Sequence, residues 1–221
     1  MNNLFVAFLL LLSVGGAAAD ESARKVDLGG GRALLYEHEL GGRYQTLVLV
    51  YNGDVLRKLH GVADEGGLLE YERSPVISSD SRYAVVNQVE SDCDERGRNS
   101  HEVAYCELID LKSGCIVARD TGQFCGGEFT DSGEWRTVVF QDLNLLEATP
   151  AAEKYVSGRL SFSDSPSDSL GSLLVCDPLG EDNVKYYKRL ADEKFSNLSD
   201  GARNKLRNVL RVNGYWSNAE K

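Results

Sequence analysis

The sequence lacks the short motifs that mark most catalytic and metal sites. It contains no Gly-x-Ser-x-Gly and no His-Glu-x-x-His pattern, and its three histidines are His38, His60 and His101. A nucleophilic serine or cysteine needs a base beside it, and no recognisable pattern places a histidine for that purpose. We therefore expect no catalytic residue, no metal site and no cofactor.

Two stretches match known binding loops only in part. Gly29-Gly30-Gly31 precedes a predicted strand and lacks the Gly-Lys-Ser/Thr ending of a phosphate-binding loop, so it indicates a turn. The stretch from Asp92 begins like a calcium loop, but Arg96 occupies the third ligand position and Val103 replaces the closing glutamate. With 34 acidic residues in the chain, no pattern singles out a catalytic pair of carboxylates.

Long apolar runs are also missing, except near the N-terminus. Leu4–Val14 is apolar but shorter than the roughly 20 residues of a membrane span, and small residues follow it up to Ala19. This order is typical of a secretory signal, so we predict that residues 1–19 are cleaved and that the mature protein works in the periplasm or is secreted. No later segment is long and apolar enough to predict a membrane span.

The charge of the chain is acidic and unevenly distributed. The formal net charge is −10, with +3 in residues 181–221 and −13 in residues 20–180. An acidic body repels nucleic acid and attracts cationic molecules over distances beyond direct contact. We therefore expect a cationic protein partner and no nucleic acid.

The cysteines indicate disulfides, because the chain is predicted to be exported and has no Cys-x-x-Cys pair. Four of the five lie within residues 93–125, on predicted neighbouring strands. Local pairing favours Cys93–Cys106 and Cys115–Cys125, with Cys176 free, although other pairings of the four remain open.

Most of residues 24–176 reads as short strands separated by turns, within a predicted β-rich domain of residues 20–180. The β-rich runs are Ala33–Glu39, Tyr44–Tyr51, Tyr83–Val89, Val103–Leu111, Cys115–Arg119, Arg136–Gln141 and Leu173–Cys176. Glycine-rich turns separate them, and Asn52-Gly53 is typical of a two-residue hairpin. The pattern predicts a mainly β domain of antiparallel meanders, arranged as a sandwich, an open barrel or a partial propeller.

Residues 181–221 change to helical spacing. Val184, Tyr187 and Leu190 lie on one face of a first predicted helix, and a second runs from a cap at Ser199 or Asp200 to Gly214. We predict two short helices that pack on the sheet as part of the same domain.

One turn sequence occurs twice. Ser78-Ser79-Asp80-Ser81-Arg82-Tyr83 and Thr130-Asp131-Ser132-Gly133-Glu134-Trp135 each precede a β-rich run, and Asp110-Leu111-Lys112-Ser113-Gly114 lies between them. Residues 74–140 thereby resemble blades of TolB-like β-propellers, which implies antiparallel meanders and a role as an envelope scaffold. Locally, the Ser and Asp side chains are expected to bind turn amides, and the aromatic residue to begin the next buried strand.

The stretch Glu90–Glu102 (ESDCDERGRNSHE) is predicted to be an acidic loop between two strands, close to a disulfide. Such a loop can grip a basic groove on another protein, and we predict Glu90, Asp92, Asp94 and Glu95 as its contacts.

Together, export, small size and the acidic loop suggest a binding protein that is not an enzyme. The profile is similar to those of periplasmic immunity proteins and lysozyme inhibitors, which neutralise a toxin or hydrolase. Two alternatives remain: a TolB-like envelope scaffold, and a hydrolase whose site is assembled from scattered residues.

Overall fold

The computed structural model describes residues 23–60, 67–93, 99–137, 142–162, 170–192, 194 and 198–216, without the side chains of residues 91–93 and 99–101. The predicted export signal, residues 1–19, lies outside this part of the chain.

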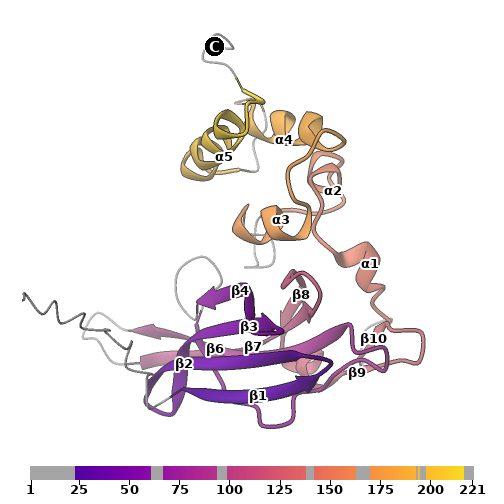
Figure 1. The fold of residues 1–221 in the computed structure, drawn as a ribbon. Helices are drawn as coiled ribbons and strands as arrows, with labels where there is room; N and C mark the ends of the chain where they lie inside the picture. Colours follow the sequence, from indigo (N-terminus) through magenta and orange to yellow (C-terminus); the bar gives the residue numbers. More distant parts are fainter. Residues whose placement is uncertain are drawn as a thin grey trace, which may run out of the picture.

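Eight antiparallel strands form one sheet in the described part of the chain (Figure 1). The strands are β1 (Arg24–Gly29), β2 (Arg32–Leu40), β3 (Arg43–Tyr51), β4 (Asp54–His60), β5 (Leu68–Leu69), β6 (Tyr83–Cys93), β7 (Asn99–Asp110) and β8 (Ile116–Thr121). Their order is β1-β2-β3-β5-β6-β7-β8, and β4 also pairs with β3. The predicted mainly β fold of antiparallel meanders is confirmed, and the sheet is open because its order begins at β1 and ends at β8.

Positive backbone angles explain the tight turns between the strands. Asn52 and Gly53 have φ values of 51° and 90°, and the flanking residues Tyr51 and Asp54 pair across the turn. Positive φ at both central residues is the signature of the hairpin turn that matches strand twist, and asparagine and glycine adopt it most readily. The predicted hairpin at this position is confirmed.

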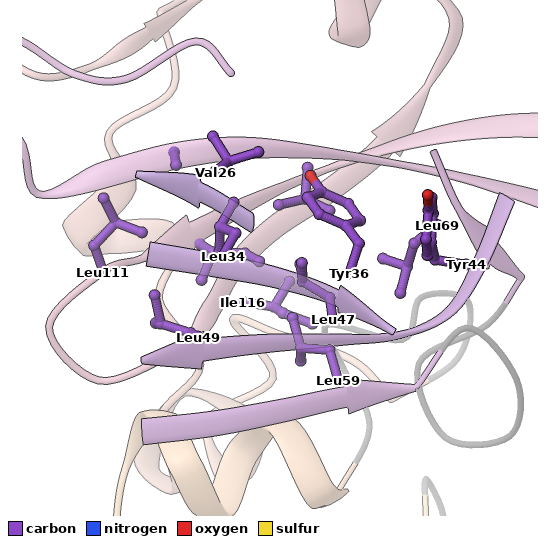
Figure 2. Packing of buried hydrophobic residues seen from close by; sticks show 13 residues of the cluster. Val26, Leu34, Tyr36, Tyr44, Leu47, Leu49, Leu59, Leu69, Leu111 and Ile116 are labelled. Atoms are coloured by element: carbon purple, nitrogen blue, oxygen red, sulfur yellow. The ribbon is translucent and has the colours of Figure 1, made fainter. Parts of the chain in front are cut away.

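Alternation along the strands builds a core on each face of the sheet. On β6, Ala84 and Val86 enter one cluster of buried residues, whereas Tyr83 and Val85 enter another, as expected because successive side chains point to opposite faces. The first cluster also contains residues of β2 and β3, with Tyr36 and Tyr44 toward one end and Leu111 toward the other (Figure 2). The cluster therefore joins strands from β1, through Val26, to β8, through Ile116.

The second cluster is covered by a short segment that follows β8. This segment contains the 3-10 helix η1 (Gly122–Gly126) and a two-stranded sheet of β9 (Glu128–Phe129) and β10 (Trp135–Arg136). Trp135 is fully buried there, and its indole nitrogen donates to the Phe124 carbonyl. Of the strand predicted for residues 136–141, residues 138–141 lie outside the described part of the chain.

The repeated turn has the local chemistry that its sequence predicts. Ser78 Oγ donates to Asp80 and accepts from the amides of Arg82 and Tyr83. In the second copy, Thr130 Oγ1 accepts from the Glu134 amide. Because the side chains satisfy the turn amides, the buried rings of Tyr83 and Trp135 can each begin a strand, β6 and β10 respectively.

In the described part of the chain five short helices follow the eight-stranded sheet, and the last four share a core of their own. They are α1 (Leu145–Ala148), α2 (Ala152–Val156), α3 (Leu170–Cys176), α4 (Val184–Ala191) and α5 (Asp200–Val212). The two predicted helices correspond to α4 and α5, and the Ser199 side chain caps α5 by accepting from the Ala202 amide. Their buried residues cluster with those of α2 and α3, however, and no strand residue with a described side chain belongs to that cluster.

Three details of the sequence-based assignment are therefore wrong. The helical part begins at Leu145 and not at residue 181. The sheet is contacted by α1 and α3, on β8, while α4 and α5 lie beyond α3 (Figure 1). The strand predicted at Leu173–Cys176 is the second half of α3. A short apolar run fits a buried strand and a buried helix equally well, and only the helical core into which Leu170 and Leu173 point distinguishes them.

The two disulfides join Cys106 to Cys125 and Cys115 to Cys176. Disulfide formation is confirmed, but the predicted pairs Cys93–Cys106 and Cys115–Cys125 are wrong, and Cys176 is not free. Local separation misleads here because η1 folds back onto β7, and α3 packs against the start of β8. The Cys93 side chain lies outside the described part of the structure.

Candidate functional site

The predicted acidic loop is largely a strand pair. The ladder between β6 and β7 runs from Tyr83 opposite Asp110 to Cys93 opposite Asn99, so most of the stretch Glu90–Glu102 belongs to a long hairpin. Asp94 and Glu95 lie outside the described residues, as does the Asp92 side chain. Of the four predicted contact residues, Glu90 alone has a described side chain.

The carboxylates of Glu90 and Glu102 lie on opposite faces of this hairpin. Glu90 pairs with Val103, and Glu102 pairs with Ser91, one residue further along each strand. A shift of one residue turns a side chain to the other face of a sheet. The acidic stretch therefore contributes to two different faces of the sheet. On each face, an arginine from outside the hairpin binds the glutamate.

On the first face, Arg119 of β8 holds Glu90. Its Nη2 atom lies 2.6 Å from Glu90 Oε1, and its guanidinium lies 3.6 Å from the centre of the Tyr105 ring. The Arg119 side chain is 2% exposed and that of Glu90 is 37% exposed. A buried guanidinium stacked on an aromatic ring has little freedom to move, so Glu90 is fixed in place.

The same arginine also faces a second, fully buried carboxylate. Glu107 stands directly opposite Arg119 in the ladder between β7 and β8, and Arg119 Nε lies 3.3 Å from Glu107 Oε1. Burial raises the pKa of Glu107 to about 7, although Arg119, Gln88 and Arg57 lower it in part. Glu107 is therefore a buried group of the sheet that can change charge near neutral pH.

On the other face, Arg43 of β3 binds Glu102 at a solvent-exposed position. Two nitrogens of its guanidinium donate to the two carboxylate oxygens of Glu102, at 3.0 and 3.1 Å. Arg43 Nε also lies 3.7 Å from a carboxylate oxygen of Glu70. The side chains of Arg43 and Glu102 are 28% and 43% exposed. This pair is therefore solvated, whereas Arg119 is buried with Glu107.

A groove open to solvent lies beside Arg43. It has a volume of about 620 Å³, and its lining includes Arg24, Glu39, Arg43, Tyr44, Glu70 and Tyr71. These residues come from β1, the end of β2, the start of β3 and the segment after β5. We call this groove, together with the neighbouring end of the β6–β7 hairpin, the recognition end.

Tyr44 and Tyr71 form the tyrosine floor of the groove, and the buried Tyr36 packs against both rings. The rings of Tyr36 and Tyr44 are 5.5 Å apart and those of Tyr36 and Tyr71 are 5.3 Å apart, both edge to face. The Arg24 guanidinium lies 4.9 Å from the centre of the Tyr71 ring. Burial raises the pKa of Tyr36 to about 12, so the hydroxyl stays neutral. A rigid aromatic floor with charged walls is a common form of polar binding site.

The two histidines with described side chains, His38 and His60, do not line this groove. His38 is exposed near the end of β2, and His60 is exposed at the end of β4. Within the described part of the chain, no three His, Cys, Asp or Glu side chains are grouped as metal ligands. Nor, among the same residues, does any helix have the length and apolar character to cross a membrane.

Sequence reasoning missed Arg43, Arg119 and Glu107. One signal was available for Glu107, which stands between Tyr105 and Ile109 at a strand position where alternation requires a core residue. A charged residue at such a position predicts a buried partner of opposite charge. The partner itself, Arg119, is identified only by the strand pairing.

Comparison with known proteins adds no identity: no family model, curated protein or solved structure matches the chain. The two disulfides are typical of proteins that fold in an oxidising compartment.

Proposed function

We propose that this protein is an exported, non-catalytic binding protein that neutralises a cationic toxin or hydrolase in the bacterial periplasm, as immunity proteins and inhibitors do. The recognition end is its contact surface. Asp92, Asp94 and Glu95 add negative charge at the hairpin, while Glu90, held by Arg119, supports it.

The observation that carries this proposal is the gathering of carboxylates from three separate segments around the tyrosine floor. Glu39 and Glu70 line the groove, and Glu102 is joined to it through Arg43. The side chains of Glu70 and Glu102 are 45% and 43% exposed to solvent, so a partner can reach them. Arg24 and Arg43 also line the groove, so the three carboxylates exceed the basic side chains there by one charge. A basic side chain that enters here meets this excess negative charge and the aromatic surface, which favour it together.

The arrangement suits binding because its charges are already held in position. Glu102 is fixed by two hydrogen bonds from Arg43, and the Glu39 carboxylate accepts a hydrogen bond from the Tyr44 hydroxyl. Side chains fixed before contact lose little conformational entropy when a partner binds. The net charge of −13 in residues 20–180 attracts a basic protein before the surfaces meet.

The test is capture from envelope extract with the mature protein, followed by binding kinetics of the partner with two charge-reversal variants. Glu70→Lys changes the groove, and Glu153→Lys changes an exposed, ion-paired residue of α2 as the matched control. We expect Glu70→Lys to lower the association rate constant about tenfold at low salt. The loss should shrink as salt rises, because charges are screened over about 8 Å at physiological ionic strength.

Reversal of Asp92, Asp94 and Glu95 tests the hairpin in the same way. Equal association of all variants with the partner, at low and at high salt, would remove the recognition end from the proposal. An enzyme would show the opposite behaviour: one substitution would abolish turnover of the captured molecule while leaving its binding unchanged.

A further inference from the structure

Arg119 is shared by two carboxylates at different depths. Glu107 is 0% exposed, Arg119 is 2% exposed, and the Glu90 side chain is 37% exposed. The three side chains therefore form a charged path from the core to the surface of the β6–β7 hairpin. Each contact joins a different strand pair: Glu107 belongs to β7, Arg119 to β8 and Glu90 to β6.

The charged and polar groups that act on Glu107 come from three strands. Arg119 faces it from β8, Gln88 and Glu90 from β6, and Arg57 from β4. When Glu107 is ionised, the positive charges of the two arginines and the negative charges of the two glutamates in this group cancel. When Glu107 is protonated, the group carries one net positive charge, directly behind the hairpin.

We propose that Arg119 transmits the charge state of Glu107 to Glu90 and so makes the recognition end sensitive to pH. The inference rests on the proposed function for its biological meaning, but the coupling itself is a property of the unbound protein. Arg119 is the positioning residue, because it acts through Glu90 and not by contact with a partner.

The direction of the effect follows from the charges. Above about pH 7 Glu107 is ionised and attracts Arg119, so the arginine is shared between two carboxylates. Below about pH 7 Glu107 is neutral, and the Arg119 charge acts on Glu90 alone. The hairpin then presents less negative potential, and a cationic molecule associates more slowly.

The first arm of the test needs no partner. In wild-type protein, the ¹³C shift of the Glu107 carboxyl and the amide shifts of Glu90 and Val103 are followed by NMR against pH. We expect all three to change with one midpoint near pH 7. In Glu107→Gln the midpoint should vanish from both amides, and in Glu37→Gln, which removes one charge from a different ion pair of the sheet, it should remain.

Two results would overturn the inference: amide shifts of Glu90 and Val103 that do not follow Glu107 in wild type, or a midpoint that survives in Glu107→Gln. If Glu107→Gln does not fold, the wild-type titration still decides, and Arg119→Lys tests the transmission with the cation retained. A lysine cannot reach both carboxylates in the forked geometry of arginine, so the shared midpoint should be lost at Glu90 alone.

The second arm uses a fluorescent oligolysine peptide as a probe of the recognition end. Its association rate constant with wild type should fall about twofold from about pH 8 to about pH 6 at low salt, and that with Glu107→Gln should stay constant. Equal pH dependence of the two would contradict control by Glu107. If the peptide and the captured partner both fail to bind at any pH, the proposed function fails, and the NMR arm alone judges the coupling.

Discussion

The two arginines that hold the β6–β7 hairpin perform the same task in opposite environments. Arg119 pairs with Glu90 and Glu107 beneath the sheet surface, and Arg43 pairs with Glu102 in contact with solvent. A solvated pair contributes little because water competes for both partners, whereas a buried pair is costly to break because the remaining charge is left unsolvated. The same residue types should therefore differ several-fold in their effect on stability.

The largest effect is expected when the buried pair is broken. Arg119→Met removes the cation but keeps the length of the side chain, and leaves Glu107 and Glu90 without it. We expect a loss of about 4 kcal/mol in the free energy of unfolding at about pH 8, measured by urea denaturation. The loss should be smaller at about pH 5, since Glu107 is then protonated. A loss independent of pH would show that Arg119 acts by packing alone.

The next effect concerns Glu107 and pH. Its pKa is about 7 in the folded protein against an ordinary value of 4.5, so folding favours the protonated form. The contribution to stability is full below about pH 4.5 and is lost as the pH rises to about 7, a decrease of about 3 kcal/mol. Urea denaturation across this range checks it. Glu107→Gln should flatten that part of the profile, and an unchanged profile in the variant would assign the titration to another group.

The smallest effect is expected on the open face. Arg43→Met should lower the free energy of unfolding by about 0.5 kcal/mol, because the ion pair with Glu102 is exposed, and added salt should reduce even this. The measurement is the same urea denaturation, at low and at high salt. If Arg43→Met cost as much as Arg119→Met, burial would not be what separates the two arginines.

The class of fold could be predicted because it depends on local patterns. Alternation of apolar and polar residues indicates strands, since each strand has one side toward a core. Asn52-Gly53 predicts its hairpin from backbone preference alone, and the spacing of Val184, Tyr187 and Leu190 predicts α4 in the same way. These features need no knowledge of which segments meet in space.

The candidate site could not be predicted, because its contacts join residues far apart in the sequence. Arg43 meets Glu102 across a separation of 59 residues, and Arg119 meets Glu90 across 29. The acidic run from Glu90 to Glu102 suggested a single surface, but strand register divides it between two faces. The net charge of the run can be counted from the sequence, whereas the face on which each charge lies depends on the strand register.

By itself, the sequence determined the antiparallel meanders, the turns and helices α4 and α5, because backbone preference and hydrophobic periodicity act within a few residues. It also indicated disulfides in an acidic chain. Only the tertiary structure decided which cysteines pair, that residues 170–176 form a helix, and that one buried arginine serves two carboxylates. Those outcomes depend on which strands and helices become neighbours, and burial of apolar surface over the whole chain selects the neighbours.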